Sequence, residues 1–266
     1  MIVFAFGCGR VGFDPHAVDA PLGPWSSPVP IPALSTAFGE EDVTGASTKT
    51  ELIFRLGAAE LYTSTRATTD DAWGPPQALV DVNTTNYEAA PRLSQDDLTL
   101  YFQSNRPGGA GLDDVWMTTR ASIGAAWGPA TNVGFVNTAA IEKWLTVCDA
   151  NHYMVVRVVA GKDTVFQGVL GSAPSPVPEL NTGSESGVEL MADCLTVYFN
   201  SNRNGSSDIF VATRPTIADA WGLPVLMPDV NLPQFGEQDP WMSPDQRLFT
   251  FSSDRAGTTD IYMMTR

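Results

Sequence analysis

The segment EAAPRLSQDDLTLYFQSNRPGGAGLDDVWMTTR, residues 88–120, decides the fold, because copies of it recur along the chain. The C-terminal copy, EQDPWMSPDQRLFTFSSDRAGTTDIYMMTR at 237–266, matches it nearly position for position. A third copy, ESGVELMADCLTVYFNSNRNGSSDIFVATR, occupies 185–214. A chain built from such copies is predicted to have a repeat fold.

Each copy carries the signals of short strands joined by turns. Within the segment above we expect strands at 90–93, 98–103 and 115–119, where aliphatic, aromatic and β-branched residues gather as half-buried strands require. A tryptophan, a Gly-Pro or Gly-Leu-Pro step and a short apolar strand ending in Val-Asn follow, and this pattern ends at Asn83, Asn137 and Asn231. The third repeat keeps only PVPELN, ending at Asn181.

A glutamate opens every repeat and gives the period. The five are Glu40, Glu88, Glu142, Glu185 and Glu237, spaced by 48, 54, 43 and 52 residues. Periods of this size with four strand signals each are typical of β-propeller blades.

The two ends of the chain complement each other. The sequence stops at Arg266, after the third strand of the fifth repeat, whereas WSSPVPIPALS at 25–35 resembles a fourth strand without a blade. Trp25 stands where Trp73, Trp127 and Trp221 stand in other repeats. We therefore predict one all-β domain over 25–266, a five-bladed β-propeller in which the N-terminal strand completes the last blade and removes open sheet edges.

Charge and composition exclude several functions. The chain has 30 acidic and 15 basic residues, a net charge of −15, so it should repel nucleic acids and anionic lipid surfaces. His16 and His152 are its only histidines, which disfavours a histidine-based metal site or catalytic triad. No glycine-rich loop joins a strand to a helix, so nucleotide hydrolysis is not expected.

The cysteines suggest an exported protein. The apolar run MIVFAFG before Cys8 resembles the end of a bacterial lipoprotein signal peptide, although no basic residue precedes it. Residues 1–24 are thus predicted to be a signal remnant and flexible tether with Cys8 as a lipid anchor; the alternative is an apolar N-terminal strand or leader. Cys148 and Cys194 lie in equivalent hairpin regions, so they form either a disulfide or two small buried contacts. A periplasmic or extracellular location follows from the export signal.

The repeats resemble the WD40-like (PD40), TolB-type propeller family, whose motif is roughly S-P-D-G-x-x-L-Y-F-x-S-N-R followed by a glycine-rich loop and D-I-Y. The resemblance is carried by SQDDLTLYFQSNR at 94–106, DCLTVYFNSNR at 193–203, and SPDQ, SSDR and DIY at 243–246, 252–255 and 260–262. The first repeat is shortened and the third, at 143–170, lacks the Ser-Asn-Arg element. Such a resemblance implies the fold, and the family includes binding proteins, periplasmic scaffolds and domains attached to enzymes.

Recurring charged residues are the first candidates for a site. We hypothesise that the five glutamates form a ring at one mouth of the channel and bind a cation, most simply Ca²⁺. Alternatively, each glutamate accepts backbone N–H groups at the junction between blades. The arginines of Ser-Asn-Arg are predicted to pin their hairpins through nearby aspartates: Arg106 with Asp113 or Asp114, Arg203 with Asp208, and Arg255 with Asp260.

Two tryptophans differ from the others by position. Trp144 and Trp241 fall on inner strands near the channel, where they could stack a sugar or a peptide side chain, or simply pack between blades. Trp25, Trp73, Trp127 and Trp221 are predicted to anchor the packing of the blades.

These observations predict a monomeric, non-catalytic binding or scaffold propeller that presents one face to a protein, peptide or glycan and needs no cofactor, Ca²⁺ excepted. The alternative is a carbohydrate-active enzyme resembling glycoside hydrolases, since several furanosidase families have similar propellers. An enzyme should hold two or three carboxylates in a deep pocket with unlike surroundings. A scaffold should instead have a shallow channel, or one that side chains block.

Overall fold

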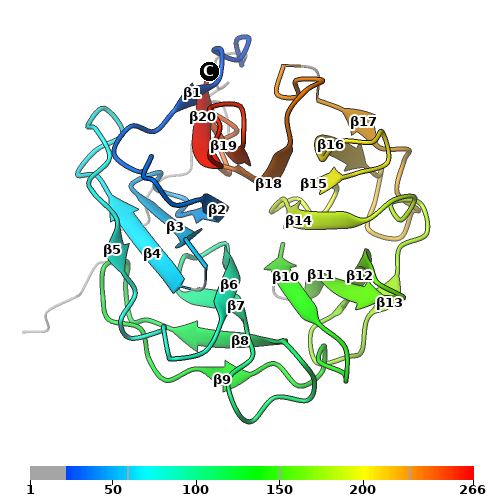
Figure 1. Ribbon diagram of the computed structural model, residues 1–266. Coiled ribbons are helices and arrows are strands. Elements are labelled where there is room, and N and C mark those ends of the chain that lie inside the picture. Colours follow the sequence, from blue (N-terminus) through cyan, green and yellow to red (C-terminus); the bar gives the residue numbers. More distant parts are fainter. Residues whose placement is uncertain (1–21, 59, 150, 228) are drawn as a thin grey trace, which may run out of the picture.

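The computed structural model describes residues 22–58, 60–149, 151–227 and 229–266. In this part of the chain, twenty strands form five four-stranded antiparallel sheets that are arranged as a ring (Figure 1). The prediction of an all-β, five-bladed propeller is confirmed. The described residues contain no helix that could cross a membrane.

The blades have the same order, from the channel outward. Blade 1 consists of β2 (Glu40–Gly45), β3 (Glu51–Leu56), β4 (Glu60–Thr65) and β5 (Gln77–Ala78). Blade 2 consists of β6 (Glu88–Leu93), β7 (Thr99–Ser104), β8 (Asp114–Thr119) and β9 (Thr131–Asn132). Blade 3 consists of β10 (Glu142–Val147), β11 (His152–Val159), β12 (Lys162–Val169) and β13 (Ser175–Pro176). Blade 4 consists of β14 (Glu185–Leu190), β15 (Thr196–Ser201), β16 (Asp208–Thr213) and β17 (Val225–Leu226).

Blade 5 joins the two ends of the chain. It consists of β18 (Glu237–Met242), β19 (Leu248–Ser253), β20 (Asp260–Thr265) and, from the N-terminus, β1 (Val29–Pro30). Val29 lies opposite Met263, and β1 runs beside β20 in Figure 1. Backbone bonds on either side of β1, from Ser26 N to Thr265 O and from Ile31 N to Ile261 O, extend the pairing. The predicted ring closure is therefore present, although the strand itself is shorter than 25–35.

Stacked arginine and tryptophan side chains hold the outer strands. In four blades the arginine that follows the third strand lies over the ring of the next tryptophan, with the guanidinium carbon 4.2–4.4 Å from the ring centroid. The pairs are Arg66 with Trp73, Arg120 with Trp127, Arg214 with Trp221, and Arg266 with Trp25. Such contacts contribute roughly 0.5–2 kcal/mol each. These tryptophans are packing anchors, as predicted.

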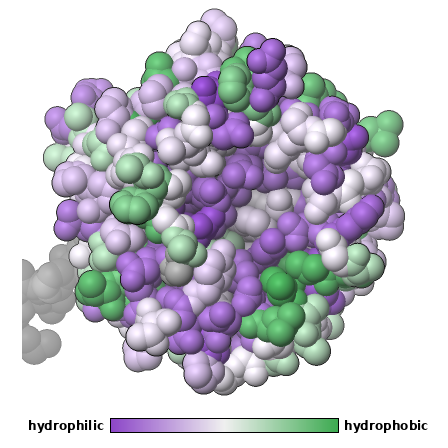
Figure 2. All heavy atoms as spheres, viewed as in Figure 1, coloured by the Kyte–Doolittle hydropathy of each residue, from purple (hydrophilic) through white to green (hydrophobic). Residues whose placement is uncertain are grey.

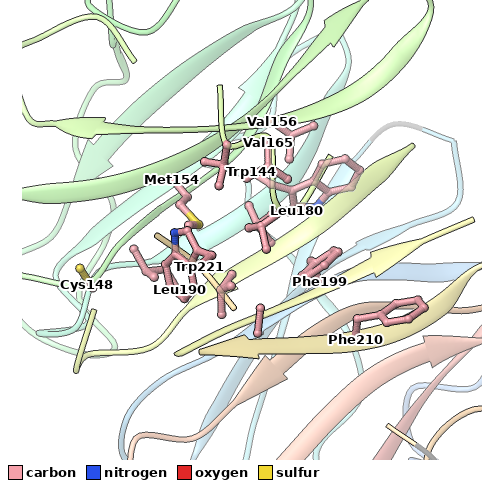
Figure 3. Close-up of a cluster of buried hydrophobic side chains, with 14 of the residues drawn as sticks. Trp144, Cys148, Met154, Val156, Val165, Leu180, Leu190, Phe199, Phe210 and Trp221 are labelled. Atoms are coloured by element: carbon pink, nitrogen blue, oxygen red, sulfur yellow. The ribbon is translucent and has the colours of Figure 1, made fainter. Parts of the chain in front are cut away.

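The hydrophobic core is shared between neighbouring blades. Figure 3 shows one cluster in which Met154, Val156 and Val165 of blade 3 face Phe199 and Phe210 of blade 4. The inner faces of both sheets are apolar, so each blade buries its face only against the next one. The ring therefore depends on all five blades for its core.

A disulfide joins two blades. Cys148 and Cys194, in the turns after β10 and β14, are bonded with their Cα atoms 5.2 Å apart. Of the two interpretations of these cysteines, the structure has the disulfide. Cys8 and most of the predicted tether lie outside the described residues.

We expect the double substitution Cys148→Ala/Cys194→Ala to lower the free energy of unfolding by about 2–4 kcal/mol, because the bond constrains the unfolded chain across a separation of 46 residues. Denaturant unfolding of the variant and of the oxidised protein measures the difference. Treating the parent protein with a thiol reductant should reproduce the effect, and reductant should leave the variant unchanged. Equal stability of variant and parent would contradict a bond that constrains the chain.

Candidate functional site: the channel mouth

The five repeated glutamates point into their own blades. All five are fully buried. Glu88 accepts hydrogen bonds from Thr84 N (3.0 Å), Ser104 Oγ (2.9 Å) and Arg106 Nη2 (3.0 Å). Equivalent arginines contact the glutamates of blades 3, 4 and 5: Arg157 with Glu142, Arg203 with Glu185, and Arg255 with Glu237. The glutamate thus joins the segment entering a blade to the hairpin of that blade.

This geometry corrects the hypothesis of a carboxylate ring. Among the described residues, the only carboxylates or thiols that approach one another as metal ligands would are Asp149 with Cys148 and Cys194, whose sulfurs form the disulfide. The glutamates do not converge and offer no shared calcium site there. Backbone N–H groups and arginines hold their oxygens, which agrees with the alternative of acceptors at the blade junctions.

The expected pairs between arginine and aspartate are also wrong. The guanidinium of Arg106 folds back over the Phe102 ring, 4.7 Å from its centroid, and so reaches Glu88 across the strand. Asp114 instead accepts the backbone N–H groups of Ala110 and Gly111. The aspartate shapes the loop, and the arginine pairs with the inner-strand glutamate.

Every inner strand is bulged at its third residue. The register of each inner pair shifts after the second residue, for example between Glu41 and Thr44 in blade 1. The third residues, which all have a positive φ of 48–60°, are Asp42, Ala90, Trp144, Gly187 and Asp239. A bulge turns side chains away from their alternating direction. Non-glycine residues hold this conformation only where their surroundings enforce it, as functional sites often do.

The bulges build a polar pit at one mouth of the channel. The second and third residues of four inner strands line a cavity of about 150 Å³ together with Arg55, Tyr87 and Gln103. These inner-strand residues are Glu41, Asp42, Lys143, Trp144, Ser186, Gln238 and Asp239. Hydrophilic residues also surround the centre of the face shown in Figure 2.

The two inner tryptophans have different roles. Trp144 lines the pit, and the ammonium of Lys143 lies 4.4 Å from its ring centroid. Trp241 packs at the junction of blades 5 and 1, so close to Gly45 that a Cβ there would lie 2.8 Å from the ring. Trp144 is therefore a candidate for ligand contact, and Trp241 is a packing residue.

Two aspartates in the pit have unlike surroundings. Asp42 Oδ2 accepts from Arg55 Nε (2.9 Å) and Ala90 N (3.2 Å), so a guanidinium balances its charge. Asp239 is buried and its Oδ2 accepts the N–H of Asp42 at 3.0 Å. Burial, reinforced by the charge of Asp42, raises the pKa of Asp239 to about 7. One carboxylate is thus held as an anion while its neighbour retains a proton near neutral pH.

A buried ion pair closes the channel farther along the inner strands. Arg92 Nε lies 3.3 Å from Glu189 Oε2, and both side chains are buried. Arg92 of blade 2 also donates to the carbonyl oxygens of Val188 in blade 4 and Val43 in blade 1. Its side chain therefore crosses the channel, and the pit is blind.

Sequence reasoning missed Asp42 and Asp239. Each lies two positions after a repeated glutamate, in EED and EQD, whereas the other blades have Ala90, Trp144 and Gly187 there. The departure from the repeat was the available signal, because residues that differ among equivalent blades are free of the common architectural role.

The pKa of Asp239 predicts a pH dependence. Its folded-state pKa of about 7 exceeds the unfolded value of about 3.9, so its contribution to stability is complete below pH 4 and is lost as the pH rises to about 7. Asp239→Asn keeps an acceptor for Asp42 N without the charge. We expect it to raise the free energy of unfolding by about 1–3 kcal/mol at pH 8 and little at pH 4.

Urea unfolding of both proteins at several pH values measures this difference. The matched control is Asp70→Asn, which removes an exposed carboxylate outside the pit. If Asp239→Asn and Asp70→Asn had the same effect between pH 4 and 8, the raised pKa would be refuted.

No protein-family model matches this sequence, and a search of curated proteins gives no match. Among solved structures, a putative TolB from Agrobacterium tumefaciens is similar with TM-score 0.56 and 14% identity, over 87% of this chain and 79% of that one. An endo-arabinase from Bacteroides thetaiotaomicron has TM-score 0.60 and 10% identity, over 91% and 97%. A family 117 glycoside hydrolase from Zobellia galactanivorans has TM-score 0.56 and 12% identity, over 86% and 84%. These likenesses establish a fold shared with TolB propellers and with glycan-degrading enzymes.

Proposed function

We propose that this protein is a binding β-propeller whose pit holds one sugar unit of a glycan. The observation that carries the proposal is the composition of the pit, which combines carboxylate, amide, hydroxyl and ammonium groups with the aromatic residues Tyr87 and Trp144. Sugar hydroxyls need donors and acceptors together, while the apolar face of a sugar ring packs on aromatic side chains. Pits of this composition suit a polar, uncharged ring.

The size of the pit favours a small unit. Its volume of about 150 Å³ lies below the roughly 300–1,000 Å³ of pockets for drug-sized ligands. Because Arg92 and Glu189 close the channel, a polymer cannot thread through it. A terminal or side-chain sugar entering from one face fits this shape.

An oxidising environment supports a location outside the cytoplasm. The disulfide between Cys148 and Cys194 would persist in the periplasm or outside the cell, and glycans are accessible in both places. The net charge of −15 argues against nucleic acid as the ligand. We propose a periplasmic or extracellular monomer, with Cys8 as a lipid anchor.

A carbohydrate-active enzyme is the second candidate, and one observation favours it. Asp239 and Asp42 line the same pit in contrasting environments, one able to keep a proton and the other paired with Arg55. Glycoside hydrolysis uses such a pair as general acid and as base or nucleophile. In this mechanism Asp239 would protonate the leaving oxygen and Asp42 would act on the opposite side of the sugar.

The binding proposal predicts that Gln238→Ala weakens glycan affinity about tenfold, because one hydrogen bond in a partly buried site is worth roughly 1–1.5 kcal/mol. Arabino- and xylo-oligosaccharides are suitable probes in calorimetric titrations. Gln77→Ala, which removes the same amide from the exposed outer strand of blade 1, is the matched control and should bind as the parent does. Equal affinities of the two variants, or no heat with either probe, would contradict the proposal.

The enzymatic candidate predicts that the parent protein releases reducing ends from these oligosaccharides and that Asp239→Asn is slower by about 10²–10⁴. Binding by the variant should persist, since the amide fills the same space. Prolonged incubation of the parent without product would exclude hydrolysis of these substrates and leave the binding proposal intact.

A further inference from the structure

Blades 2 to 5 each contain a socket that an arginine fills. In blade 2 the Nη2 atom of Arg106 donates to Glu88 Oε1 (3.0 Å) and to the carbonyl oxygen of Val82 (2.8 Å). The guanidinium lies over the rings of Phe102 and Trp116. The arginines of the other three blades make the same contacts to a glutamate, an aromatic ring and a carbonyl oxygen: Arg157, Arg203 and Arg255.

Blade 1 has the same socket without its arginine. Leu56 lies opposite Glu40, in the register position that Ser104 has opposite Glu88 and that Arg157 has opposite Glu142. The hairpin from β3 to β4 contains only residues 57–59 and no arginine.

The walls of the blade 1 socket are nevertheless complete. Phe54 and Tyr62 face each other across β3 and β4, as Phe102 and Trp116 do across β7 and β8. The turn at Leu34 repeats the one at Val82, since each N–H bonds to the carbonyl oxygen three residues earlier. Carboxylate, rings and carbonyl are in place, and the cation is missing.

Glu40 is the residue that this absence affects. It is fully buried, and the N–H and hydroxyl of Thr36 both donate to its Oε1 atom. Its Oε2 atom is buried without a hydrogen-bond partner among the described residues. Glu185 Oε2 shares that lack, but Arg203 balances the charge of Glu185. Burial without a cation raises the pKa of Glu40 to about 7.

An open cavity lies next to this socket. It measures about 380 Å³ and is lined by Phe38, Leu56, Gly57, Ala58, Glu60 and Tyr62. Phe38 is 65% exposed at its rim, and Glu60 adds a second carboxylate, which accepts from the Tyr62 hydroxyl at 3.2 Å. Only the side chain of Leu56 separates the cavity from Glu40, its partner across the strand pair.

We propose that blade 1 is a receptor for an arginine side chain of a partner protein. The incoming guanidinium would stack on Tyr62, displace the Leu56 side chain and reach the free oxygen of Glu40. Arginine fits better than lysine, because a planar fork can bond a carboxylate and a carbonyl oxygen together while it stacks on a ring. The net charge of −15 favours a basic partner, and the cavity exceeds a guanidinium in size, so flanking residues of the partner also fit. This inference is independent of the glycan pit.

The test titrates acetyl-Gly-Arg-Gly-amide into the full chain and follows backbone amide resonances by nuclear magnetic resonance. We expect saturable shifts at Gly57, Ala58 and Glu60, with a dissociation constant near millimolar as for one charged anchor. The same peptide with citrulline, which has the shape of arginine without its charge, should bind at least tenfold more weakly, and Glu40→Gln should weaken the arginine peptide similarly. Equal binding of the two peptides, or no shifts at these residues, would overturn the proposal.

A second variant keeps the test decisive if Glu40→Gln does not fold. Leu56→Arg places an arginine where blade 3 has Arg157, so it should fill the socket from within, raise the melting temperature and abolish the shifts caused by the arginine peptide. Leu56→Met is the matched control, because it keeps an apolar side chain of similar volume and should still bind. Unchanged peptide binding by Leu56→Arg would refute the assignment of this socket.

Discussion

The buried glutamate at the start of each inner strand is the constraint on which the rest of the structure depends. In blades 2 to 5 it accepts a backbone N–H from the segment that enters the blade and a guanidinium from the hairpin of the same blade. Removing charges from water is costly, so such a pair adds little net stability. Its effect is on register, because a slip of one residue would leave a buried carboxylate without donors.

Fixed register decides what the channel mouth can contain. With the glutamate held, the bulge that follows turns the next two residues of each inner strand toward the pit. The architecture does not dictate their identity, and the blades place Asp42, Trp144, Gly187 and Asp239 at equivalent positions. The propeller is therefore nearly symmetric in its skeleton and asymmetric where it can meet a ligand. That asymmetry places a proton-retaining carboxylate beside an ion-paired one.

Blade 1 shows the consequence of losing half of the repeated pair. Its hairpin is short, Leu56 replaces the polar residue opposite the glutamate, and Glu40 keeps an oxygen without a donor. Natural proteins seldom leave a buried polar atom unsatisfied without a role for it. A repeat protein offers an internal comparison here, since the four other blades show what the missing group would be.

The sequence by itself determined the number of blades, the closure of the ring by the N-terminal strand and the packing role of the tryptophans that follow the Thr-Arg pairs. These features follow from period and position along the chain, which the repeats display directly. The direction of the glutamates, the partners of the arginines and the pit around Asp42 and Asp239 were decided only by the tertiary structure. The bulges break the alternation of side chains, and neighbours from different blades meet across the channel, so spacing along one strand could not predict which residues face inward.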